Sequence, residues 1–144
     1  MTETDREFMS WRDSYEIRIP PIDRQHRRIL ELINELHRAV GSVDRTETIA
    51  AALRAMVTYT REHFVDEEAL MQRLGFEGLG SQRQEHAAFV EKVTGYLIRL
   101  KSGADLAPQE LLAFLREWWE NHICGSDREI GPAYAARKTA VANR

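Results

Sequence analysis

The sequence is poor in cysteine, glycine and proline. Its 144 residues include one Cys, eight Gly and four Pro. The single thiol, Cys124, cannot form an intrachain disulfide, which excludes a disulfide-stapled scaffold and makes a reducing, cytoplasmic compartment the expectation. Because helix-breaking residues are few, the chain can form long uninterrupted helices.

The sequence also lacks a large excess of one charge and any long apolar run. Lys and Arg number 20 and Asp and Glu number 23, for a net charge of −3, so a basic nucleic-acid-binding surface is not expected. No apolar run approaches the roughly 20 residues of a membrane-spanning helix, and residues 1–13 lack the basic start and apolar stretch of a signal peptide. With 43% apolar residues, the chain predicts one folded domain with a hydrophobic core, no membrane partner and no nucleic-acid partner.

Four segments have helical periodicity, because their apolar residues recur at spacings of three and four. Breaks that contain glycine or proline separate these segments, which span residues 22–40, 46–74, 81–101 and 108–124. We expect Gly41 to end the first helix in the left-handed conformation and Pro108 to occupy the first turn of the fourth. Short connections favour antiparallel neighbours, so the predicted fold is all-α, an up-down-up-down antiparallel four-helix bundle.

The predicted bundle occupies residues 22–126 of a single domain over residues 1–144. Residues 1–21 form an N-terminal arm, which aromatic side chains are expected to anchor, and residues 127–144 form a short C-terminal helix and tail. The expected anchors are Phe8, Trp11 and Tyr15. Asp23 is interpreted as a capping residue at the start of the first helix, with a hydrogen bond to a ligand histidine as the alternative.

Polar residues interrupt the apolar stripe of every predicted helix. They are His26, His63, Glu67, Gln82, His86, His122 and Asp127. In such a bundle the starts of the first and third helices and the ends of the second and fourth meet at one end. We therefore expect these side chains to share one layer of the core. The fifth histidine, His37, lies at the other end of its helix and is interpreted as a surface or boundary residue.

A metal site explains this layer better than a set of isolated core histidines. Burial of an imidazole or carboxylate without a partner costs several kcal/mol, and imidazole with carboxylate suits iron, manganese or zinc. Six ligands fit two ions bridged by Glu67 and Asp127. His63 and Glu67 share a helical face at the i,i+4 spacing. The i,i+5 step from His122 to Asp127 is expected to need the helix to end and the chain to curl back, which Gly125 permits.

Several spaced motifs resemble those of single-domain bacterial hemerythrins over about residues 11–130. They are IDRQH at residues 22–26, YTREHFVDEE at 59–68, HAAF at 86–89 and WWENHI at 118–123, followed by Asp127. The resemblance implies a non-heme di-iron centre, bridged by an oxo or hydroxo group, that binds dioxygen reversibly. It implies that His26 and His63 ligate the iron with the open position, that His86 and His122 ligate the other, and that Glu67 and Asp127 bridge them.

Two residues depart from the pattern that the resemblance implies. Gln82 stands where the family places a further ligand histidine, and is at most a weak ligand through its amide oxygen. Trp119 stands where a leucine or isoleucine lines the oxygen pocket, while the aromatic residue of that pocket is kept as Phe64. With Gln82, both irons can accept an exogenous ligand, which predicts weaker or shorter-lived oxygenation. Glu68 is expected to face solvent.

Three functions remain open from the sequence. The first is dioxygen carriage, storage or sensing by a di-iron centre. The second is a di-iron enzyme with peroxidase-like, oxidase-like or nitric-oxide-related activity. The third is a degenerate bundle with one metal or none. Peroxide, azide and nitric oxide are further candidate ligands, and the sequence does not give the oligomeric state.

Overall fold

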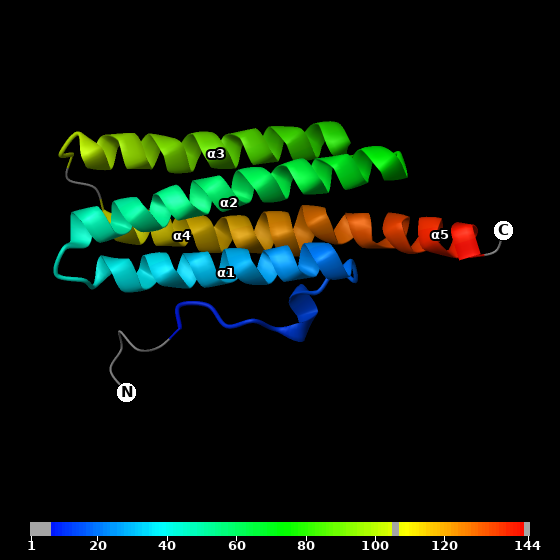
Figure 1. The fold of residues 1–144 in the computed structure, drawn as a ribbon, viewed down its shortest axis with the longest axis horizontal. Coiled ribbons are helices and arrows are strands. Elements are labelled where there is room, and N and C mark those ends of the chain that lie inside the picture. The colour runs from blue at the N-terminus through cyan, green and yellow to red at the C-terminus, as the bar shows by residue number, and fades with distance from the viewer. Residues whose placement is uncertain (1–6, 105–106, 143–144) are drawn as a thin grey trace.

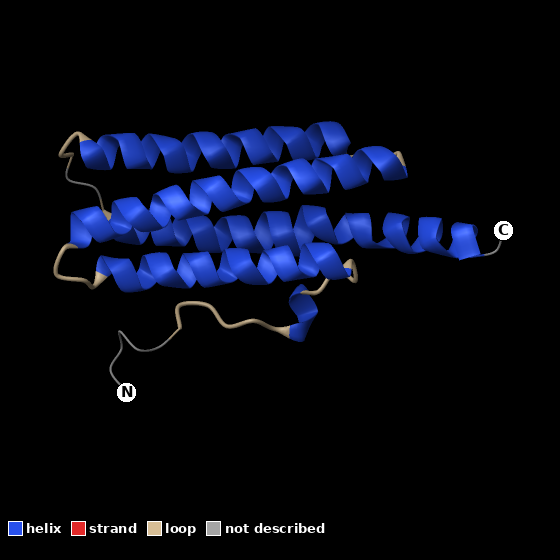
Figure 2. Ribbon diagram, in the orientation of Figure 1, coloured by secondary structure: helices blue, strands red, loops and turns tan. Residues whose placement is uncertain are grey.

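A computed structural model describes residues 7–104 and 107–142, which form a four-helix bundle with an extended C-terminal helix. The bundle helices are α1 (Pro20–Val40), α2 (Arg45–Leu74), α3 (Leu79–Lys101) and α4 (Pro108–Trp118). They run alternately in opposite directions, as predicted (Figure 1). No strand occurs within the described ranges, so the all-α prediction is confirmed (Figure 2).

The helix ends follow from local backbone chemistry. Pro20 and Pro108 lie in the first turns of α1 and α4, where the missing N–H of proline costs no helical hydrogen bond. The left-handed cap is at Gly75, which ends α2 with φ +64°. The prediction of a left-handed Gly41 is wrong, because this residue has φ −91° and its N–H bonds to the carbonyl of Arg38.

The fourth helix does not end at Gly125, and the prediction that the chain curls back there is wrong. A π-helix, η3 (Trp119–Ser126), continues α4 directly and leads through the 3-10 turn η4 (Asp127–Glu129) into α5 (Ile130–Ala142). Figure 1 shows α5 extending beyond the bundle on the line of α4. In the π-helix the N–H of Asp127 bonds to the carbonyl of His122, so residues five apart lie one turn apart.

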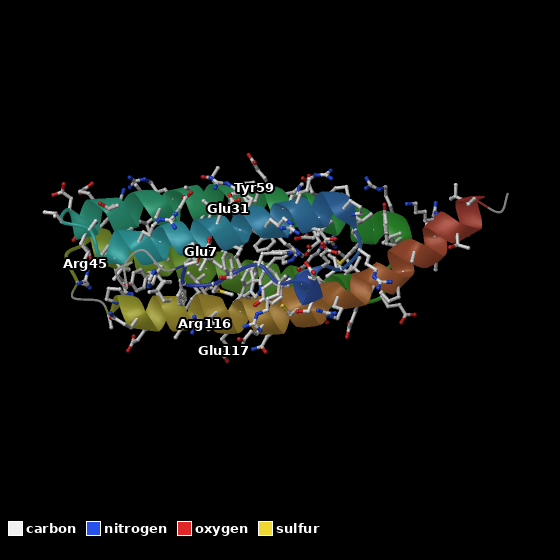
Figure 3. All side chains as sticks on the ribbon, turned by 90° about the horizontal axis from the view of Figure 1, so that it is seen from below. Glu7, Glu31, Arg45, Tyr59, Arg116 and Glu117 are labelled. Atoms are coloured by element: carbon white, nitrogen blue, oxygen red, sulfur yellow. The ribbon has the colours of Figure 1, made fainter. Side chains whose placement is uncertain are left out.

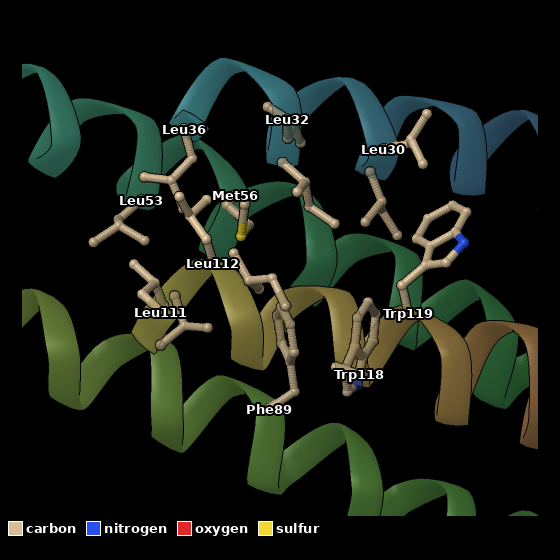
Figure 4. Close-up of a cluster of buried hydrophobic side chains, with 14 of the residues drawn as sticks. Leu30, Leu32, Leu36, Leu53, Met56, Phe89, Leu111, Leu112, Trp118 and Trp119 are labelled. Atoms are coloured by element: carbon tan, nitrogen blue, oxygen red, sulfur yellow. The ribbon is translucent and has the colours of Figure 1, made fainter. Parts of the chain in front are cut away.

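The hydrophobic core fills the bundle on the side of the α1–α2 and α3–α4 connections. Figure 4 shows Leu36, Leu53, Met56, Leu111 and Leu112 meeting there from α1, α2 and α4. The aromatic residues follow toward the other end of the bundle, where Trp118 lies beside Phe89 and Trp119 points toward α1. Charged side chains such as Glu31 and Glu117 lie on the outside (Figure 3).

The arm packs along the bundle through its aromatic residues. Trp11 and Tyr15 make edge contacts with Trp119, with ring centroids 6.2 and 5.4 Å apart, and Phe8 stacks on His37. Asp23 accepts hydrogen bonds from the backbone N–H groups of Ile17 and Ile19 at the start of α1. The described part of the arm is thus anchored as predicted. Residues 1–6 of the arm and 143–144 of the tail lie outside the described residues.

Within the described part of the chain, no helix is both long enough and apolar enough to cross a membrane.

Candidate metal centre

Four histidines and two carboxylates meet in the core at the end of the bundle from which α5 extends. His26 comes from α1, His63 and Glu67 from α2, His86 from α3, His122 from η3 and Asp127 from η4. Each of these side chains is buried, with an exposed fraction of at most 3%. The structure therefore brings together all six ligand residues expected from the sequence. His37 lies away from them, partly exposed against Phe8.

Glu67 divides its two carboxylate oxygens between two pairs of histidines. Its Oε2 lies 3.4 Å from Nε2 of His26 and 3.1 Å from Nε2 of His63. Its Oε1 lies 3.0 Å from Nε2 of His86 and 3.9 Å from Nε2 of His122. This is the arrangement that a carboxylate bridging two ions requires.

Asp127 divides its oxygens in the same way. Its Oδ2 lies 3.1 Å from Nε2 of His26, and its Oδ1 lies 3.3 Å from Nε2 of His122. The π-helix makes this possible, because it places Asp127 one turn beyond His122. Two groups result, each with its ligand atoms within 4.8 Å of one another: His26, His63, Glu67 and Asp127; and Glu67, His86, His122 and Asp127.

The shared carboxylates set the charges of the metal-free site. Burial alone would lower the pKa of His26 and of His122, but Asp127 and Glu67 outweigh it and raise these pKa values to about 9 and about 10. Burial would raise the pKa of Glu67, but the surrounding histidines hold it well below its usual value. Without metal, His26 and His122 are therefore cations at neutral pH, and Glu67 is an anion.

The donor atoms fit a metal better than they fit one another. Among the described residues, Nε2 of His26, Nε2 of His63, Oε2 of Glu67 and Oδ2 of Asp127 are buried yet form no hydrogen bond of acceptable geometry. Buried polar atoms without partners are destabilising. A cation among them would satisfy all four, and two imidazoles with two carboxylates are a donor set that suits iron, manganese or zinc.

The outer nitrogens of three histidines have hydrogen-bond partners that the sequence analysis missed. Nδ1 of His63 lies 2.6 Å from Oε1 of Gln25, Nδ1 of His86 lies 2.8 Å from Oε2 of Glu68, and Nδ1 of His122 lies 3.3 Å from Oε1 of Glu85. Glu68, expected to face solvent, is only partly exposed, because one of its oxygens lies against His86 while the other accepts a hydrogen bond from Arg83. Such partners orient metal-ligating imidazoles and fix their tautomers.

Gln82 lies beside the second group of donors. Its Nε2 donates a hydrogen bond to Oδ1 of Asp127 at 2.9 Å, and its side chain is 2% exposed. Its Oε1 has no hydrogen-bond partner among the described residues. The structure thus places Gln82 at the centre, as a neighbour of Asp127.

Aromatic rings enclose the centre on several sides. Phe64 stacks on His86 with ring centroids 3.9 Å apart, and Trp118 stacks on His122 at 5.2 Å. Trp119 is fully buried with its ring centroid 6.3 Å from that of His26. Phe64 therefore borders both groups, through His86 and through His63, and Trp119 borders the group of His26.

Comparisons with known proteins place this architecture in a family. Residues 19–134 match the hemerythrin HHE cation binding domain. The bacteriohemerythrin of Stenotrophomonas maltophilia is 37% identical over 137 residues, which cover 95% of this chain and 86% of the relative. The myohemerythrin of Riftia pachyptila is 32% identical, over 81% of this chain and 86% of the relative. A crystal structure of wild-type hemerythrin matches with a TM-score of 0.80 at 28% identity, over 88% of this chain and 97% of the other. By its sequence and by its fold, the chain belongs to the hemerythrin family.

Proposed function

We propose that this protein is a non-heme di-iron protein that binds dioxygen, for carriage, storage or sensing. The observation that carries the proposal is the division of the carboxylate oxygens: Glu67 and Asp127 each turn one oxygen to each group of histidines. His26 and His63 would hold one iron and His86 and His122 the other, with an oxo or hydroxo group as a third bridge. When bound, the two ferrous ions would supply the electrons with which dioxygen is held.

The protein residues act by orientation and by exclusion of water. Gln25, Glu68 and Glu85 hold three imidazole rings with Nε2 turned inward. Trp119 fills the space beside His26 and is itself covered by Trp11 and Tyr15 of the arm. We infer that Phe64 and Trp119 line the space that dioxygen enters, and that the aromatic cover limits the ligand to a small molecule such as dioxygen, peroxide, azide or nitric oxide.

The alternative function is a di-iron enzyme with peroxidase-like, oxidase-like or nitric-oxide-related activity. The comparisons do not favour it, because the matched relatives are named as hemerythrins. The proposal includes a cytoplasmic location, which rests on the single cysteine, Cys124, as expected in a reducing compartment.

Iron analysis and air exposure test the proposed function. The protein loaded anaerobically with ferrous iron should hold two irons per chain, and air should produce an absorption band that disappears again under vacuum or argon. His63→Ala should lose iron, because it removes an imidazole donor and the binding free energy it contributes to the fold. His37→Ala is the matched control and should keep both irons.

Fewer than two irons in the native chain would contradict the proposed centre. Rapid, irreversible oxidation in air would leave the metal centre intact but favour the enzyme over the dioxygen-binding protein. Unchanged iron content in His63→Ala would remove this residue from the site.

A further inference from the structure

The two candidate metal positions have the same protein donors. Each has two imidazoles, one oxygen of Glu67 and one oxygen of Asp127. Non-heme iron held by two histidines and a carboxylate keeps open positions for exogenous ligands. If one iron binds a small ligand because its protein donors are incomplete, the other iron is incomplete to the same degree.

Gln82 marks where the open position of the second iron lies. Its Nε2 and Nε2 of His122 contact the same oxygen, Oδ1 of Asp127, at 2.9 and 3.3 Å. The amide therefore belongs to the side of His86 and His122. Its Oε1 is buried and has no partner within the described residues, so the site holds a polar atom that the protein itself leaves unsatisfied.

A surface pocket reaches the outer side of His122. A pocket of about 300 Å³ lies between α3 and the α4–η3 helix, and its lining includes Glu85, Trp118 and His122. Only the ring of His122 therefore separates this pocket from the second group, on the side of the centre away from Trp119, which lies next to His26.

On the basis of the proposed function, we propose that the iron held by His86 and His122 has a ligand site of its own, beside the Gln82 amide, for water or a small anion. The amide hydrogen-bonds this ligand, because Oε1 can accept from water and the second N–H of Nε2 can donate to an anion, the first being directed to Asp127. It does not ligate the iron, because a neutral amide oxygen is a weak ligand compared with imidazole. The loaded centre accordingly binds two small anions, one at each iron.

Azide titration of the oxidised, iron-loaded protein tests this inference. After iron analysis has established two irons per chain, calorimetry and absorption should give two azide ions per centre in the native protein. Gln82→His should give one, since residue 82 lies four residues before His86 on the same face of α3 and an imidazole there can fill the position. Gln82→Leu should still bind two, with the second bound about fivefold more weakly for loss of one hydrogen bond.

Gln84→His is the matched control, because Gln84 is exposed on the same helix and its variant should keep two azide ions. One azide in the native protein, or two in an iron-replete Gln82→His, would overturn the inference while leaving the di-iron function intact. If Gln82→His fails to hold iron, the comparison of native protein with Gln82→Leu decides, and equal affinities would count against Gln82. A native protein with fewer than two irons would overturn both the proposed function and this inference.

Discussion

The hydrogen-bond partners of the histidines follow one pattern along the chain. Gln25 precedes His26 in the sequence and contacts Nδ1 of His63. Glu68 follows Glu67 and contacts Nδ1 of His86. Glu85 precedes His86 and contacts Nδ1 of His122. Each partner thus neighbours a ligand residue on its own helix and reaches the histidine of the next helix. The pattern covers three of the four histidines, because Nδ1 of His26 has no hydrogen-bond partner among the described residues.

Carboxylates bond to the histidines of the second donor group, and a neutral amide bonds to a histidine of the first. Glu68 contacts His86 and Glu85 contacts His122, whereas Gln25 contacts His63. An anion behind an imidazole raises its basicity as a ligand. We therefore expect these two carboxylates to make His86 and His122 stronger metal ligands, which would offset the absence of a third imidazole at the position of Gln82.

Substitution of Glu68 tests this compensation. Glu68→Gln keeps the shape of the side chain but removes its charge, so the affinity for the second metal ion should fall about 10- to 100-fold, with little change at the first. Competition with a chelator, which resolves two binding steps, measures both affinities. Glu117→Gln, on the outside of α4 (Figure 3), is the control and should change neither. Equal losses at both positions would show that Glu68 acts on the fold rather than on His86.

These partners could not be identified from the periodicity of the sequence. Periodicity identifies the inward face of a helix, and five of the six expected ligand residues, all but Asp127, lie on that face. Glu68 and Glu85 are partly exposed and stand beside the inward face, where the pattern resembles ordinary surface charge. Only their position next to ligand residues was a signal, and the packing of neighbouring helices was needed to show which histidine each one reaches.

The π-helix is the element that completes the metal site. An ordinary α-helix would place Asp127 about 140° around the helix from His122, since five residues at 3.6 per turn overshoot one turn by that angle. The wider π-helix returns Asp127 to the face of His122 and continues without interruption into α5. The sequence predicted that these two residues share a site, but it did not predict the π-helix. Residues five apart do not share a face of an α-helix, so their spacing suggested that the helix ends between them.

Two glycines, Gly125 inside the π-helix and Gly131 where α5 meets the arm, can be compared by the space that each leaves for a side chain. A Cβ at Gly125 would meet its nearest atom, the carbonyl oxygen of Glu120, at 3.8 Å, which is ordinary contact. A Cβ at Gly131 would lie 2.6 Å from the carbonyl oxygen of Ile17, a backbone atom of the arm that cannot move alone. Glycine is thus required where α5 meets the arm and not inside the π-helix.

Gly131→Ala should therefore lower the free energy of unfolding by about 1–3 kcal/mol through overpacking, whereas Gly125→Ala should change it by less than about 1 kcal/mol. Denaturant unfolding of the metal-free proteins measures both. The Gly125→Ala variant should also keep two irons. Loss of iron from that variant would show that the helix does depend on glycine there, as the sequence suggested.

At the scale of the whole molecule, proton binding and metal binding compete for the same buried groups. The pKa values of His26 and His122 are raised in the folded, metal-free chain to about 9 and about 10, from 6.5. The stability that these two cations contribute is fully present below about pH 6.5 and is lost as the pH rises through 9 to 10. Glu67, with its lowered pKa, contributes stability that is lost in acid. These three groups therefore stabilise the metal-free protein most between the ordinary pKa of Glu67, 4.5, and that of the histidines, 6.5.

Metal has the opposite dependence, because a histidine must lose its proton to become a ligand. His26 and His122 each give up a proton when metal binds at neutral pH, so metal affinity rises with pH until both pKa values are passed. The melting temperature of the loaded protein should exceed that of the metal-free protein by a margin that widens from about pH 6 to about pH 9. Calorimetric metal titration in buffers of different ionisation enthalpy should detect about two released protons per chain near neutral pH.

A variant that lacks one of the two cations identifies the source of these protons. His26→Gln should release about one proton fewer on binding zinc, a redox-inactive probe that imidazole and carboxylate ligands also suit. His37→Gln should release the same number as the native protein, since His37 lies against Phe8 and away from the centre. A margin between the melting temperatures that stays constant with pH would mean that the metal-free centre holds no proton for the metal to displace. Proton release that His26→Gln leaves unchanged would mean that a group other than His26 carries the proton.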